Sequence, residues 1–104
     1  MEKQQLLSEI KKLVLLQEPK AEVILYGSYA RGDNGPESDI DLLILLDSDN
    51  ITYEDKRRIS YPLYDLELLT HQVISPLIKS KKTWYELYPN TALFINIKKD
   101  GITI

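Results

Sequence analysis

The chain has 104 residues, of which 43% are hydrophobic and 28% are charged, and its formal net charge is −3. This length predicts a single domain over 1–104, and the acidic balance argues against general binding to a nucleic-acid backbone. Without cysteine the chain has no disulfide and no thiolate metal site. No apolar run is long enough to span a membrane, so we expect a cytoplasmic protein with no membrane contact.

Residues 2–17 are predicted to form an amphipathic helix. Its apolar side chains recur with the helical period, and its lysines lie away from that face. Glu18-Pro19 then ends the helix. We expect this helix to pack on a sheet and to act as scaffold.

A strand is predicted over 21–26, and it stops at Gly27 in the sequence GSYARG. Such a stop predicts a tight turn into a short helix beginning at Ser28. The free N–H groups of the turn and the positive end of the helix would bind a phosphate. Gly27 lets the anion approach without a Cβ in the way, and Ser28 adds a hydroxyl donor. A Gly-Ser pair alone is equally typical of an ordinary turn.

The next strand is predicted over 40–46, after an exposed loop rich in turn-forming residues at 33–37. Asp39 and Asp41 stand two residues apart at its start, so their side chains should emerge on the same face, with their Cα atoms roughly 6.6 Å apart. Two carboxylates at this spacing suit magnesium, which also accepts phosphate and water ligands. The alternative is an edge strand with a polar face in water.

The two motifs together, GSYARG followed by SDIDLLI, resemble the signature of the polymerase-β-like nucleotidyltransferases, especially their minimal members. The resemblance implies an α/β (α+β) fold with a small mixed sheet of about three strands flanked by helices. It also implies that Gly27 and Ser28 contact phosphates and that Asp39 and Asp41 hold magnesium, with two ions when nucleotide is bound. Arg31 would contact phosphate, or form a salt bridge across the loop.

Residues 51–70 admit two interpretations, a helix kinked at Pro62 or a strand over 64–68. The choice matters because the resembled family carries a third acidic residue on the next strand. In the strand interpretation that residue is Asp65 or Glu67. We favour the helix, in which case the next strand is 71–79, an edge strand marked by Pro76 that contains no carboxylate.

Two further helices are predicted near the C-terminus, over 81–88 with Ser80 as its N-cap and over 91–99 with an end at Asp100-Gly101. His71 has no companion of metal-ligand type and is given no catalytic role. The lysines of this region are expected to form a solvated face.

The resemblance implies an enzyme that transfers a nucleoside monophosphate from a nucleoside triphosphate to a hydroxyl acceptor. The transferred group is expected to be AMP and its donor ATP. Minimal family members often act with a small helical partner protein, some as the antitoxin of a toxin–antitoxin pair. The alternative is a nucleotide-binding or partner-binding module without turnover, because the general base is unassigned. The sequence does not specify the acceptor, the preferred base of the nucleotide, or whether the chain forms a homo-oligomer.

Overall fold

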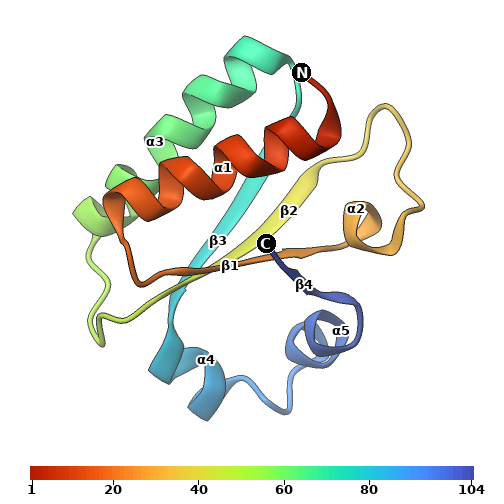
Figure 1. The fold of residues 1–104 in the computed structure, drawn as a ribbon. Helices are drawn as coiled ribbons and strands as arrows, with labels where there is room; N and C mark the ends of the chain where they lie inside the picture. Colours follow the sequence, from red (N-terminus) through yellow and green to blue (C-terminus); the bar gives the residue numbers. More distant parts are fainter.

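The computed structural model describes residues 1–104 and contains one mixed sheet with helices on both faces (Figure 1). The elements, in chain order, are α1 (Lys3–Gln17), β1 (Glu22–Tyr26), α2 (Ser28–Arg31), β2 (Ile40–Leu46), α3 (Tyr53–Thr70), β3 (Ile74–Ser80), α4 (Lys81–Leu87), α5 (Ala92–Asp100) and β4 (Ile102–Thr103).

The strands lie in the order β3-β2-β1-β4. β1 pairs antiparallel with β2 and with β4, whereas β3 pairs parallel with β2. The expected mixed sheet is therefore confirmed, but it has four strands and not about three. The additional strand, β4, has two residues, too few to show any periodicity in the sequence.

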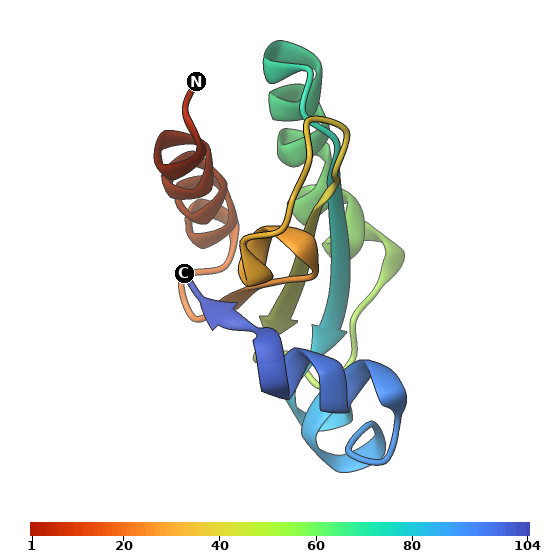
Figure 2. The same cartoon turned by 90° about the vertical axis from the view of Figure 1, so that its right-hand side faces the viewer.

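β2 is the centre of the fold, and every residue in it except Asp41 is buried. One face of the sheet packs on α1 and α3, where the buried side chains of β2 are Ile40, Leu42, Ile44 and Leu46. On the other face Leu43 and Leu45 contact Trp84 of α4 and Ile97 of α5. A strand covered on both faces is a nearly continuous apolar run, which is how this segment appears in the sequence. Figure 2 shows α4 and α5 together, away from α1 and α3.

Residues 53–70 form one helix with Pro62 inside it, so the helix interpretation is confirmed and a strand over 64–68 is wrong. A capping box fixes the start of α3, since the Thr52 hydroxyl accepts from the Asp55 N–H at 3.1 Å and the Asp55 carboxylate accepts from the Thr52 N–H at 3.0 Å. The helix ends at His71, whose φ of 60° is left-handed.

The strand expected over 71–79 begins at Ile74, because His71 instead terminates α3. β3 is an edge strand, as Pro76 predicted. Ser80 caps α4 through its hydroxyl, which accepts from the Thr83 N–H at 2.9 Å. None of the helices combines the length and the apolar character that crossing a bilayer would require.

Candidate active site at the Gly27 turn

The register of the β1–β2 pair brings the two sequence motifs to one end of the sheet. Tyr26, the last residue of β1, pairs with Asp41, the second residue of β2. The Gly27 turn therefore lies beside the start of β2, where Asp39 and Asp41 are found. Two segments that are more than ten residues apart in sequence are thus adjacent in space.

Gly27 is required by its conformation and by its surroundings. Its φ is +73°, a value that side chains with a Cβ rarely adopt. A Cβ at this position would also lie 2.5 Å from Oδ2 of Asp41. The carboxylate of Asp41 thus lies directly against the backbone of the turn, a contact that the sequence does not reveal.

The turn leads into α2, which has only four residues, in agreement with the short helix predicted. The N–H groups of Ala30 and Arg31 both donate to the Gly27 carbonyl at 3.1 Å. The N–H groups of Ser28 and Tyr29 precede these and have no acceptor within the helix. The Ser28 hydroxyl makes no hydrogen bond to the protein and is free to donate to a ligand. A single turn carries little macrodipole, so these individual donors, and not the helix as a whole, would bind an anion.

Asp39 is exposed and Asp41 is partly buried. Burial raises the pKa of Asp41 above its ordinary value, and the negative charge of Asp39 raises this pKa further, whereas Arg31 lowers it. The two carboxylates are therefore close enough to repel each other. The pKa of Tyr26 is also raised, first by burial and then by the charge of Asp41.

The donor set at Asp39 and Asp41 fits magnesium. Mg²⁺ is commonly held in proteins by one or two carboxylates together with substrate phosphates and water. No group of three or more His, Cys, Asp or Glu side chains is placed to hold a metal ion. The remaining ligands of an ion at this position would therefore come from a bound phosphate and from water.

Neither candidate for a third acidic residue reaches this site. Glu67 lies on α3, where its Oε1 accepts a hydrogen bond from the Ile74 N–H at 2.8 Å and so holds the start of β3. Asp65 is exposed on the same helix. On β3 the residue paired with Asp41 is Ser75, and the strand contains no carboxylate, as the helix interpretation implied.

Arg31 makes the ion pair considered for it, with Nε 3.2 Å from Oδ2 of Asp33. Both side chains are largely exposed, so this pair contributes little to stability. Arg31 also lines a cavity beside Gly27, and its guanidinium is therefore available at the candidate site as well.

That cavity, of about 360 Å³, contains the residues that sequence reasoning missed. Tyr26, Gly27 and Arg31 form one side, and Leu93, Asn96 and Asp100 of α5 form the other. Figures 1 and 2 both show α5 close to α2, although the two helices are distant in the chain. The one available signal was Asp100, because an acidic side chain in the last turn of a helix is unfavourable for the helix dipole.

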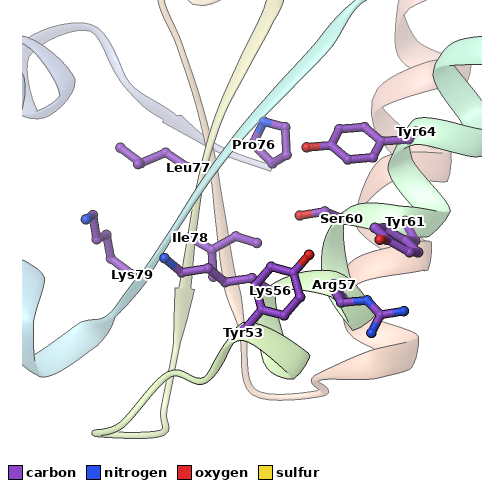
Figure 3. A pocket seen from close by; sticks show the side chains of 10 residues that line it. All are labelled: Tyr53, Lys56, Arg57, Ser60, Tyr61, Tyr64, Pro76, Leu77, Ile78 and Lys79. Atoms are coloured by element: carbon purple, nitrogen blue, oxygen red, sulfur yellow. The ribbon is translucent and has the colours of Figure 1, made fainter.

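A second cavity of about 360 Å³ lies between α3 and the edge strand β3 (Figure 3). It is lined by tyrosines and basic residues of α3 and by β3, namely Tyr53, Lys56, Arg57, Ser60, Tyr61, Tyr64, Pro76, Leu77, Ile78 and Lys79. It contains no carboxylate and is not lined by the Gly27 turn. It therefore lacks the groups that would hold a metal ion.

Residues 4–99 match the nucleotidyltransferase domain family. A protein of Methanocaldococcus jannaschii, named provisionally as a protein adenylyltransferase, is 39% identical over 79 residues, which cover 74% of this chain and 79% of that relative.

Two solved structures share the fold. A crystal structure of a toxin-antitoxin with AMP-PNP has a TM-score of 0.65 at 21% identity, covering 92% of this chain and 69% of that one. A structure from Sulfolobus solfataricus, described provisionally as a nucleotidyltransferase, has a TM-score of 0.58 at 22% identity and covers 95% of this chain and 76% of that one.

Proposed function

The chain belongs to the nucleotidyltransferase domain family, and from this premise we propose that it transfers AMP from ATP to a hydroxyl group of a protein acceptor, with magnesium. The observation that carries the proposal is the juxtaposition of Gly27 and Asp41, which joins a phosphate-binding turn to a pair of carboxylates. The provisional name of the M. jannaschii relative supports adenylyl transfer to a protein.

The turn binds the phosphates of the nucleotide. The Ser28 hydroxyl and the N–H groups of Ser28 and Tyr29 donate to phosphate oxygens, and Arg31 contributes positive charge. Asp39 and Asp41 would hold magnesium, which would supply positive charge to neutralise and orient the phosphates. Burial, and then the negative charge of Asp39, raise the pKa of Asp41, and a cation at the two carboxylates would offset both effects.

The transfer itself is a displacement at phosphorus. The acceptor hydroxyl oxygen forms a bond to the α-phosphorus, the bond from that phosphorus to the bridging oxygen breaks, and pyrophosphate leaves. The acceptor proton must also leave, and the site has no third carboxylate to accept it, because Ser75 stands beside Asp41. The proton therefore passes to water or to a side chain of the acceptor protein.

We propose further that the acceptor belongs to a small helical partner and that this chain is the antitoxin of such a pair. The toxin-antitoxin structure with AMP-PNP supports this context through its shared fold. A second candidate function is binding of nucleotide or partner without turnover. The absence of an acidic residue from β3 favours it.

Release of pyrophosphate separates the two candidates. The purified chain is incubated with ATP and magnesium, alone and with a small helical protein that co-purifies with it, and that protein is analysed for added AMP by mass spectrometry. Transfer that is lost in Asp41→Asn supports the enzyme. Magnesium-dependent binding without pyrophosphate release in either mixture supports the binding module, and the absence of any nucleotide binding contradicts both.

A further inference from the structure

We propose that the face of α5 that carries Leu93, Asn96 and Asp100 is the nucleoside subsite, in which Asn96 recognises the adenine edge and Asp100 accepts hydrogen bonds from the ribose hydroxyls. This inference rests on the proposed function and names the part of the site that selects the nucleotide.

The position of the cavity is the first argument. Gly27 and Arg31 line it together with α5, so it begins where the phosphates would bind. Its volume of about 360 Å³ falls within the range of small-molecule sites, which starts near 300 Å³. A nucleotide with its phosphates on the turn therefore has a hollow adjacent to it for the nucleoside.

The second argument is that Asn96 and Asp100 have no structural task. Neither side chain forms a hydrogen bond or an ion pair within the chain, although both line the cavity. Asp100 is the last residue of α5, where the helix dipole disfavours negative charge, and Lys98 and Lys99 of the same turn do not pair with it. Helix stability thus does not explain why an aspartate stands at position 100. A ligand in the cavity that binds to this carboxylate would explain it.

The chemistry of the lining matches an adenine nucleoside. The amide of Asn96 offers a donor and an acceptor, which pair with N7 and the N6 amino group of adenine. Guanine presents two acceptors on the same edge, so one amide cannot satisfy both. A carboxylate such as that of Asp100 binds ribose hydroxyls, as acidic residues do in dinucleotide sites. Half-buried Leu93 and the ring of Tyr26 provide apolar walls for the base.

A metal-binding role for Asp100 does not fit. Asp39, Asp41 and Asp100 do not form a group that could hold one ion. Asp100 reaches the cavity from the C-terminal end of α5 and not from the sheet. The place of Asp100 in the cavity lining thus fits the nucleoside and not the metal.

The test measures binding by calorimetry with magnesium and four ligands: ATP, GTP, 2′-deoxy-ATP and inorganic tripolyphosphate. For Asn96→Ala we expect ATP affinity to fall about tenfold, the preference for ATP over GTP to disappear, and tripolyphosphate binding to stay unchanged. Asn90→Ala, at an exposed asparagine in the turn before α5, is the matched control and should behave as the wild type.

For Asp100→Asn we expect weaker binding of ATP and the same affinity for ATP and 2′-deoxy-ATP, whereas the wild type prefers ATP. An unchanged ATP:GTP ratio in Asn96→Ala, or an unchanged preference for ATP over its deoxy form in Asp100→Asn, would overturn the inference. Loss of transfer with normal binding in Asp100→Asn would also overturn it, because Asp100 would then act on the acceptor. Failure of the wild type to bind tripolyphosphate or ATP would instead contradict the proposed function.

Discussion

Gly27 and Asp41 lie against each other, so that a Cβ at Gly27 would stand 2.5 Å from Oδ2 of Asp41 and would force that carboxylate to move. The turn that we propose to bind phosphate and the start of β2, which we propose to hold magnesium, are consequently adjacent in space. A substitution in either segment should therefore change the geometry of the other.

The three glycines around the turn allow this contact to be tested by a matched series. Gly27→Ala combines a positive φ with a clash against Asp41, Gly32→Ala combines a φ of +80° with open space, and Gly35→Ala has neither feature. Positive φ alone should cost roughly 1–2 kcal/mol of folding free energy. We expect Gly27→Ala to lose magnesium-dependent nucleotide binding, Gly32→Ala to lose only stability, and Gly35→Ala to change neither. Normal binding by Gly27→Ala would show that the turn is misassigned.

Metal binding should appear as a difference in thermal stability. At a nucleotide concentration about 100 times Kd, ligand stabilisation of ~2.7 kcal/mol corresponds to a rise in Tm on the order of 10 °C for a domain of this size. We expect that rise with magnesium and a much smaller one with EDTA. In the double variant Asp39→Asn and Asp41→Asn the magnesium effect should vanish. Equal shifts with magnesium and EDTA in the wild type would contradict the assignment.

Asp41→Asn should also stabilise the protein when no metal is present. The raised pKa of Asp41 means that its charged form is less favourable in the folded than in the unfolded chain, because of burial and of Asp39. The resulting loss of stability grows as the pH rises through the folded pKa, so at neutral pH the uncharged amide removes it. Urea unfolding at neutral pH in EDTA measures the difference, and a lower stability of the variant would be inconsistent with repulsion at this site.

Ser28→Ala tests the hydroxyl donor of the turn. Its loss should weaken nucleotide binding by about 1 kcal/mol, and by up to about twice that for a charged acceptor. Stability without ligand should not change, since Ser28 makes no hydrogen bond to the protein. Calorimetry with ATP and magnesium is the measurement. An unaltered affinity would place the phosphates elsewhere.

Glu67 should prove to be structural. Glu67→Ala removes the acceptor of the Ile74 N–H and should cost roughly 1–2 kcal/mol of stability, whereas Glu67→Gln keeps an acceptor oxygen and should cost less. Both variants, and Asp65→Asn, should bind nucleotide with magnesium normally. Loss of transfer in Glu67→Gln with binding retained would assign a catalytic role to Glu67.

The start of α3 should set part of the acid sensitivity of the fold. Hydrogen bonding to the Thr52 N–H, and then to Arg58, lowers the pKa of Asp55 below its ordinary value of 3.8. Its contribution to stability is therefore complete above that value and is lost as the pH falls through the folded pKa. We expect Asp55→Asn to be destabilised at pH 6 and to approach the wild type in acid. Asp65→Asn, at an exposed aspartate of the same helix, should show no such convergence.

The parts of the fold that the sequence predicts are those fixed by local chemistry. The apolar run of β2, the stop at Gly27 and the cap residue Ser80 act within a few positions, and each appears where expected. Residues 64–68 fit two patterns. Apolar and acidic side chains alternate there as in a strand, but Leu63 and Leu66 also have helical spacing, and α3 buries both of them.

The parts that the sequence does not predict depend on distant pairing. The contact of Asp41 with Gly27 follows from the strand register after a long loop, and no local pattern encodes that register. The position of α5 follows from β4, whose two residues pair with Ile24 and Leu25 and return the end of the chain to the site. Asn96 and Asp100 could therefore not be recognised as cavity residues.

The outer edge of β3 is a poor template for a further strand. Because the Ile40 N–H donates to the Val73 carbonyl, alternation turns the backbone of Ile74, Pro76 and Ile78 away from the sheet. Glu67 already accepts from the Ile74 N–H, and Pro76 has none, so this edge retains few donors for a further strand. The opposite edge, β4, is only two residues long. Both edges of the sheet thus disfavour pairing with a strand from another molecule, a contact through which exposed sheet edges aggregate.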